Sequence, residues 1–216
     1  DAIQAMFLLY ALIACASGLV YRGLPKALAT EARQPMAPLE KSKKTVYTLA
    51  ALFSLDAFGG GFVVQSMVAL WLYQRFDLSL AAAGAVFFWT GVLTAASYLV
   101  AVRIAGRFGL VNTMVFTHIP SSLCLILLPF VPDLGWAIAL LFVRSALSQM
   151  DVPTRSSYVM AIVTPAERPA AASITSVPRS LASAMSPFLA GYMLALSAFG
   201  WPLVVAGGVK IVYDLL

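Results

Sequence analysis

The sequence has little charge and few reactive side chains. Charged residues make up 11% of its 216 residues and hydrophobic residues 61%, with one histidine and two cysteines. A soluble domain has about a quarter of its residues charged, so this composition excludes a soluble protein and indicates an integral membrane protein. Both Cys15 and Cys124 lie in apolar segments, which argues against a disulfide framework.

Motifs of common enzyme classes are also missing. The chain has no Gly-x-x-x-x-Gly-Lys loop, no Gly-x-Ser-x-Gly elbow, no His-Glu-x-x-His pair and no Cys-x-x-Cys pair. The lone histidine, His118, makes no metal site by itself. The formal charge of +5 does not indicate nucleic acid, because the basic residues are not gathered with aromatic ones. We therefore expect no enzymatic activity, cofactor, metal or nucleic-acid partner.

Apolar segments long enough to cross a bilayer follow one another along the chain. A transmembrane helix needs about 20 apolar residues, and the pattern predicts an all-α, polytopic helix bundle of about seven spans. Short connections with turn residues predict that consecutive helices are antiparallel neighbours. The predicted spans are residues 2–21, 46–73, 80–102, 111–131, 134–163, 169–198 and 202–216, the last of them truncated.

Residues 22–45 form a long polar connection between the first span and the rest. They hold six basic residues, two acidic residues and three prolines. Positively charged connections stay on the cytoplasmic side of a membrane, so we expect a multi-pass protein of the cell (inner or plasma) membrane with this loop in the cytoplasm. Binding of anionic lipids by the loop is an additional hypothesis.

Three short segments match motifs of a known transporter family. The first is residues 101–114, which contain Arg103, Gly106, Arg107 and Gly109. Arg107 and Gly109 match the Arg and Gly of a loop signature of the family, and Gly106 stands where that signature usually has Asp. Residues 158–174 contain a Pro-x-Glu-Arg turn that opens a helix rich in small residues, and residues 186–191 match the close of a Gly-Pro-x-x-Gly-Gly motif. In these segments the chain resembles the major facilitator superfamily.

The resemblance implies a twelve-helix transporter with two pseudo-symmetric halves and a substrate cavity between them. Residues 1–21 would be the last helix of the first half, 22–45 the central loop, and 46–216 the six-helix second half. The chain opens with Asp1 inside an apolar run, so we expect the missing N-terminal half of the same protein as a partner. The lipid bilayer and a small-molecule substrate are the other expected partners, and protons are a further hypothesis.

Charged residues inside the predicted spans are the candidate site. Each costs about 3 kcal/mol or more at the bilayer centre, so such residues normally face protein or water. Arg144, Asp151 and Arg155 fall within about 40° of one another on a helix. At 1.5 Å per residue, Asp56, Arg144 and Arg179 each lie about 15 Å from a membrane face, so we expect these three to meet in a substrate or ion pathway, with Gln65 and Gln149 lining it.

The surplus of arginine at this level favours an anionic or zwitterionic substrate, and Asp56 is a candidate proton carrier. Asp151 and Arg155 are predicted to form an i, i+4 pair that is either a cytoplasmic gate or purely structural. Gly59, Gly60 and Gly61 predict a hinge or a close backbone approach. His118 is interpreted as a packed polar residue, and Lys210 and Asp214 as a structural i, i+4 pair.

Three functions stay open. The first is a secondary active transporter that works by alternating access. The second is an efflux permease for cationic or amphipathic drugs or metabolites. The third, from a different class, is a non-transporting sensor or scaffold that retains the fold.

Overall fold

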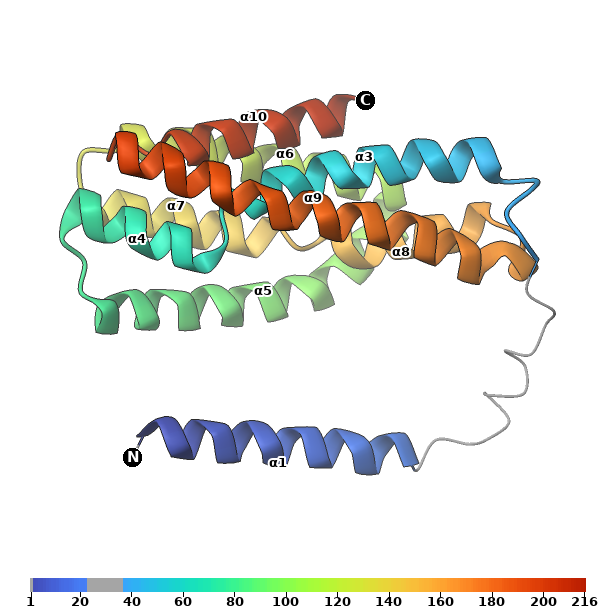
Figure 1. The fold of residues 1–216 in the computed structure, drawn as a ribbon, viewed down its shortest axis with the longest axis horizontal. Helices are drawn as coiled ribbons and strands as arrows, with labels where there is room; N and C mark the ends of the chain where they lie inside the picture. The colour runs from blue at the N-terminus through green and yellow to red at the C-terminus, as the bar shows by residue number, and fades with distance from the viewer. Residues whose placement is uncertain (1, 23–36) are drawn as a thin grey trace. The chain divides into compact units, whose positions relative to one another are not determined.

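The computed structural model describes residues 2–22 and 37–216, and these residues form helices without any β-strand (Figure 1). The rest of the predicted central loop, residues 23–36, lies outside the described residues. The chain divides into two compact units, residues 1–37 and residues 38–216. The first unit holds helix α1 (Ala2–Arg22). The prediction of an all-α fold is confirmed.

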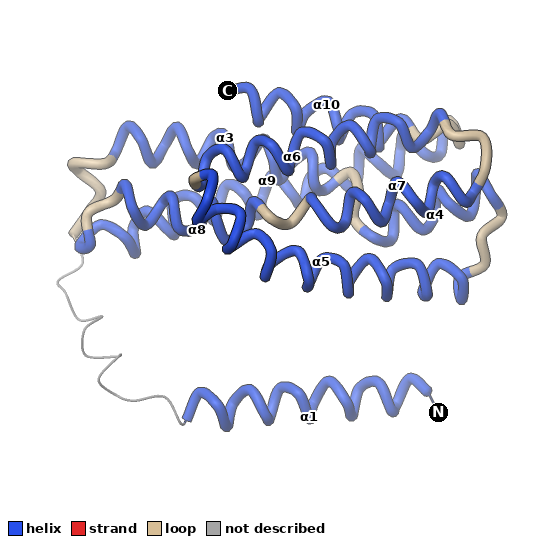
Figure 2. The backbone as a smooth tube through the Cα atoms, turned by 180° about the vertical axis from the view of Figure 1, so that it is seen from behind, coloured by secondary structure: helices blue, strands red, loops and turns tan. Residues whose placement is uncertain are grey.

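The second unit is a bundle whose longer helices run side by side (Figure 2). Several helix starts have a recognisable cause, since Ser79 and Asp133 accept hydrogen bonds from the backbone N–H groups of Ala82 and Trp136. The helices are α3 (Lys43–Gly61), α4 (Gln65–Phe76), α5 (Leu80–Phe108), α6 (Leu110–Leu127), α7 (Leu134–Leu147), α8 (Asp151–Ile162), α9 (Arg168–Leu196) and α10 (Trp201–Leu215), with short 3-10 turns η1 (Leu128–Phe130) and η2 (Pro165–Glu167).

Two predicted spans are each interrupted, which corrects the expectation of continuous helices. Span 46–73 is divided into α3 and α4, and span 134–163 into α7 and α8. The first break follows the run Gly59 to Gly61, where helix propensity is low. The second precedes Pro153, whose nitrogen carries no hydrogen and so cannot donate to a carbonyl of the preceding turn.

Within the described ranges, four helical stretches are long and apolar enough to cross a membrane. The helices of the other predicted spans are too short or too polar to be counted among these four. Helix α7 is apolar but short, and α10 has 15 residues. Helix α9 is long but carries arginine and several serines. The four stretches are Gln4–Arg22, Lys43–Phe76, Leu80–Phe108 and Leu110–Phe130.

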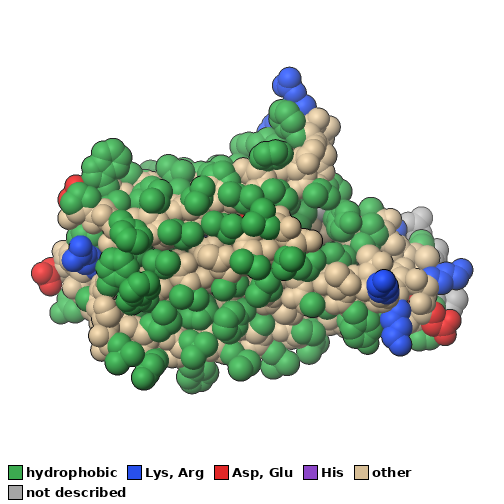
Figure 3. Space-filling model, turned by 90° about the horizontal axis from the view of Figure 1, so that it is seen from above, with side chains coloured by type: hydrophobic (Ala, Val, Ile, Leu, Met, Phe, Trp, Pro, Cys, Tyr) green, Lys and Arg blue, Asp and Glu red, His purple; other side chains and the backbone are tan. Residues whose placement is uncertain are grey.

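Hydrophobic side chains are spread across the face seen in Figure 3, and the charged side chains visible there stand toward its edges. Phe88, Phe116 and Phe188 are each more than half exposed, as expected for side chains that meet lipid rather than water. The buried apolar core is concentrated at one end of the bundle, around Trp71 and Leu128, which are 1% and 0% exposed. The opposite end has a smaller apolar cluster around Val46 and Val163.

Small residues allow the closest contacts between helices. A Cβ atom on Gly61 would lie 2.5 Å from the carbonyl oxygen of Ser183, so only glycine permits α3 to approach α9 this closely. A hydrogen bond also joins α9 to α3, since the hydroxyl of Ser186 donates to the carbonyl of Phe58 at 2.6 Å. On the other side of the bundle, a Cβ on Gly207 of α10 would lie 2.6 Å from the carbonyl oxygen of Ser122 on α6.

Glu167 joins two connections at one end of the bundle. Its Oε1 accepts hydrogen bonds from the backbone N–H groups of Glu40 and Lys41, at 2.7 and 2.8 Å. Its Oε2 accepts from the hydroxyl of Thr164 at 3.0 Å. These donors, the N–H of Glu40 foremost, lower the pKa of Glu167 to about 2. The carboxylate therefore fixes the approach to α3 against the turn before α9.

Replacing Gly207 by alanine should lower the thermal stability of the full-length protein, by about 1–3 kcal/mol of unfolding free energy, because the added methyl group overlaps α6. The matched control is Gly208→Ala, since a Cβ at Gly208 meets nothing within 4 Å. Thermal unfolding in detergent measures both. Equal effects of the two substitutions would contradict the close approach of α6 and α10.

Removing the charge of Glu167 should destabilise the protein in a pH-dependent manner. Its pKa is lower in the folded state than the ordinary 4.5, so its contribution is complete above that value and is lost as the pH falls toward about 2. The difference in melting temperature between wild type and Glu167→Gln should shrink over this range. Glu40→Gln, which removes an exposed carboxylate from the same contact region, is the control and should have no such effect.

Candidate functional site

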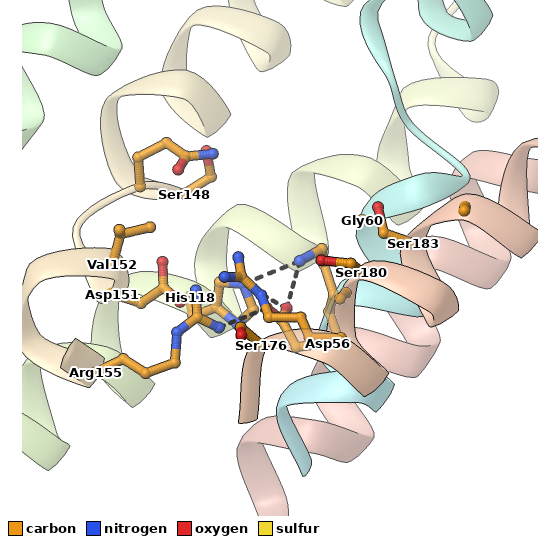
Figure 4. Close-up of a pocket in the computed structure, with 15 residues that line it drawn as sticks. Asp56, Gly60, His118, Ser148, Asp151, Val152, Arg155, Ser176, Ser180 and Ser183 are labelled. Carbon is orange, nitrogen blue, oxygen red and sulfur yellow. Dashed lines mark hydrogen bonds and ion pairs between the residues drawn. The ribbon is translucent and has the colours of Figure 1, made fainter. Parts of the chain in front are cut away.

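A polar cavity of about 550 Å³ opens among α3, α6, α8, α9 and α10 (Figure 4). Its wall on α9 is formed by Ser176, Arg179, Ser180 and Ser183. Its opposite wall contains charged side chains from four other helices. These are Asp56 of α3, His118 of α6, Asp151 and Arg155 of α8, and Lys210 of α10.

Asp56 is the centre of the charged group. Its Oδ1 accepts a hydrogen bond from Nζ of Lys210 at 2.6 Å, and its Oδ2 accepts one from the guanidinium of Arg155 at 2.9 Å. The side chains of Asp56, Arg155 and Lys210 are 7%, 7% and 11% exposed. One carboxylate thus holds together three helices that are far apart in the sequence.

The charges extend outward from Asp56 in two directions. Arg155 also contacts Asp151 at 3.3 Å and lies over the ring of Phe53. On the other side, Nε2 of His118 lies 3.3 Å from Nζ of Lys210 and 3.5 Å from Oδ1 of Asp56. The second nitrogen of His118, Nδ1, lies 2.8 Å from the carboxylate of Asp214. We call Asp56, His118, Asp151, Arg155, Lys210 and Asp214 the charge cluster.

Every carboxylate of the charge cluster is paired with a cation or with His118. Taking an ion out of water costs several kcal/mol of desolvation free energy, and attraction to a well-placed partner offsets that penalty. In the charge cluster each carboxylate has a partner, since Asp56 meets two cations, Asp151 meets Arg155, and Asp214 meets His118. With His118 neutral, three carboxylates face two cations.

A second polar cavity of about 470 Å³ lies along α4, α5 and α7. It shares Gly60, Ser148, Gln149 and Lys210 with the first cavity, so the two spaces border the same helix breaks. Arg144 contributes to this second cavity, and its Nε is buried with no hydrogen-bond partner among the described residues. A guanidinium donor without an acceptor is suited to an anion.

Asp56, Arg144 and Arg179 were predicted to meet, and Arg144 does not join the other two. Asp56 pairs with Arg155 and Lys210, whereas Arg144 lines the second cavity. Depth along a helix gives the level of a side chain but not the direction in which it points, and Arg144 faces the space between α4, α5 and α7. Arg179 does line the first cavity with Asp56, and it is exposed.

The predicted pair of Lys210 and Asp214 is also wrong. These side chains bond to Asp56 and His118 instead, because tertiary partners offer shorter and more buried contacts than the helix surface. The pair of Asp151 and Arg155 is present, and its role as a gate stays a prediction.

Other predicted residues take different places. Gln65 lines the second cavity and Gln149 both cavities. The glycine run ends α3 and provides close contacts to α9 and α10, and its role as a hinge is untested. Arg103, Gly106, Arg107 and Gly109 are exposed around the turn between α5 and α6, where Gly109 has a φ of +86° that favours glycine.

Sequence reasoning missed His118, Lys210 and Asp214 as members of the site. A signal was available, because each is ionisable and lies within a predicted span, and such residues are functional candidates by default. The sequence does not show which residues these three contact, because a helical pattern identifies the buried face of a helix and not the helix that packs against it.

The substitution Asp56→Asn should destabilise the full-length protein by about 3–5 kcal/mol, because it leaves two buried cations without their shared carboxylate. Asp77→Asn is the control, since Asp77 is an exposed residue with positive φ that asparagine tolerates. Adding Lys210→Met to Asp56→Asn should restore part of the loss. Thermal unfolding in detergent would contradict this role if Asp56→Asn and Asp77→Asn had the same effect.

Comparison with known proteins agrees with this architecture. An uncharacterized membrane protein of Saccharomyces cerevisiae is 26% identical over 193 residues, which cover 85% of this chain and 43% of the yeast protein. The chain thus spans less than half the length of that relative. A sequence model described as Major Facilitator Superfamily matches residues 49–216. This match covers most of the helical bundle and its charge cluster, and the chain belongs to the major facilitator superfamily.

Proposed function

We propose that the chain is the C-terminal part of a secondary active transporter that moves a small anionic or zwitterionic molecule by alternating access. The observation that carries the proposal is the first cavity, in which the polar face of α9 lies opposite the charge cluster (Figure 4). Membership of the family supports a transporter in general. The volume of about 550 Å³ is within the range of small-molecule sites.

The sign of the substrate charge follows from the partners of the charges that line the cavities. Carboxylates of the charge cluster are already engaged by Arg155, Lys210 and His118. Among the described residues, no carboxylate lies within salt-bridge distance of Arg144 or Arg179, although each lines a cavity. Guanidinium groups that have no carboxylate favour an anionic ligand, which they bind in bidentate geometry.

The exposure of Arg179 supports contact with the substrate. Arg179, Ser186 and Ala190 stand at i, i+7 and i+11 and so share one face of α9. Ser186 and Ala190 are buried against the bundle, whereas Arg179 is exposed where that face borders the first cavity, beside the exposed Ser176 and Ser180. A polar stripe within a membrane is unfavourable against lipid, so it requires water, substrate or a further part of the protein. The predicted second half of the cavity would belong to the N-terminal half.

Binding of anions is tested by thermal shift of the full-length protein with citrate, inorganic phosphate and the lipophilic cation tetraphenylphosphonium. We expect an anion to raise the melting temperature of wild type, and Arg179→Gln to weaken its binding by about tenfold or more, the value of one charged hydrogen bond. Arg168→Gln, which removes an exposed arginine at the start of the same helix, should bind like wild type. Stabilisation by the cation alone would support the efflux alternative instead.

Transport itself is tested with the full-length protein in liposomes. An anion identified by thermal shift should exchange across the membrane in wild type and Arg168→Gln, and exchange should be lost in Arg179→Gln. A wild-type protein that binds the anion yet exchanges none would favour the sensor or scaffold interpretation.

A further inference from the structure

The hydrogen-bond pattern around His118 specifies which of its nitrogens carries a proton. Nδ1 lies 2.8 and 2.9 Å from the two carboxylate oxygens of Asp214, and an ionised carboxylate only accepts, so Nδ1 must donate. Nε2 lies 3.3 Å from Nζ of Lys210, and an ammonium group only donates, so Nε2 must accept. The arrangement therefore fits a neutral imidazole.

A second proton on His118 would reverse one of these contacts. An Nε2–H group facing the ammonium of Lys210 places donor against donor and positive against positive. Another acceptor lies at hand, because Oδ1 of Asp56 is 3.5 Å from Nε2. That same oxygen is the one that holds Lys210 at 2.6 Å. The imidazolium and the ammonium thus compete for a single carboxylate oxygen.

We infer that His118 is a proton-binding site and that its protonation displaces the Lys210 ammonium from Asp56 toward the cavities, where it binds the anionic substrate. The inference rests on the proposed function and assigns the coupling ion and its site. The only covalent change is the N–H bond that forms when a proton from water adds to Nε2. The Nε2–H then donates to Oδ1 of Asp56, and Nζ of Lys210 exchanges that oxygen for the anion.

The charges of the cluster favour this uptake. With neutral His118, the three carboxylates Asp56, Asp151 and Asp214 exceed the two cations by one charge, and a proton on His118 balances them. When Lys210 then turns to an anion, the substrate supplies the charge that the ammonium needs. Proton and anion would be bound together, which is the requirement for symport of the two.

Space for the displaced ammonium is present. Lys210 lines both cavities, so each offers space to its side chain. A Cβ on Gly59 would lie 3.1 Å from Cγ of Lys210, so glycine lets the stem of the lysine pack closely against α3. A Cβ on Gly60 would lie 3.9 Å from Nζ, so the ammonium is less tightly enclosed than the stem.

The other groups that face His118 leave the competition at Asp56 unchanged. From α10, Tyr213 packs its ring edge-on against the imidazole, with centroids 5.8 Å apart. From α8, Arg155 and Asp151 act through Asp56. Arg144 of α7 lines the second cavity, and the arginines of α5, Arg103 and Arg107, are exposed at its end.

Protonation is tested directly by ¹⁵N NMR of the full-length protein labelled at histidine. The signal that disappears in His118→Gln is followed from about pH 8 to about pH 5, an interval chosen because histidine can change charge within it. It should show a neutral ring with a proton on Nδ1 at the upper end and an imidazolium at the lower end. If His118→Gln does not fold, the signal is assigned from its perturbation in Asp214→Asn, which keeps a hydrogen-bonding partner for Nδ1. A ring that stays in one state across this range overturns the inference.

The exchange of Lys210 is tested with citrate as the anion. Citrate should bind about tenfold more tightly at about pH 5 than at about pH 8 in wild type, one charged contact being worth that factor. In Lys210→Met the ratio of the two affinities should fall to about one, after correction for the ionisation of citrate. The control Arg168→Gln should keep the wild-type ratio. An unchanged ratio in Lys210→Met overturns the exchange. Absence of anion binding in wild type, with His118 still titrating, counts against the proposed function and not against the proton site.

Discussion

A carboxylate buried between helices must be matched by cations, and in this chain Asp56 imposes that requirement on its neighbours. It draws Arg155 from α8 and Lys210 from α10 into bonds of 2.9 and 2.6 Å, and Lys210 in turn contacts His118 of α6. Removing any partner leaves a buried charge that costs several kcal/mol. The positions of α3, α6, α8 and α10 are therefore linked, and one cannot move without a regrouping of charges.

The two helix breaks place this charge beside open space. α3 ends at Gly61, five residues after Asp56, and α8 begins at Asp151, four residues before Arg155. Gly60, Ser148 and Gln149, which adjoin the breaks, border both cavities. Interrupted helices are tolerated in membranes where their free backbone groups face protein or a watery space. The breaks thus provide both the cavity and the polar groups that line it.

The sequence was sufficient for the fold class and for part of the charge cluster, but not for the contacts between helices. Composition and the lengths of apolar segments predicted an all-α membrane protein, and the cost of intramembrane charge singled out Asp56 and Arg155. The glycine run at the end of α3 indicated a hinge or a close approach there, whereas the break after α7 was missed because apolar length alone does not reveal an interruption. Lys210 and Asp214 were paired with each other because spacing along one helix is visible in a sequence, whereas the approach of α6 and α3 is not.

The small residues of α9 lie in different surroundings. Ser173, Ser176 and Ser180 are exposed, whereas Ser183 and Ser186 contact Gly61 and Phe58 of α3.

One face of α9 therefore changes along its length. Around Ser183 and Ser186 it packs closely against α3, and around Arg179 it lines the first cavity. Because lipid is a poor environment for a guanidinium, at about 3 kcal/mol or more at the bilayer centre, the part with Arg179 requires polar surroundings. The charge cluster lines the same cavity, so the helix that packs against α3 also faces the buried charges.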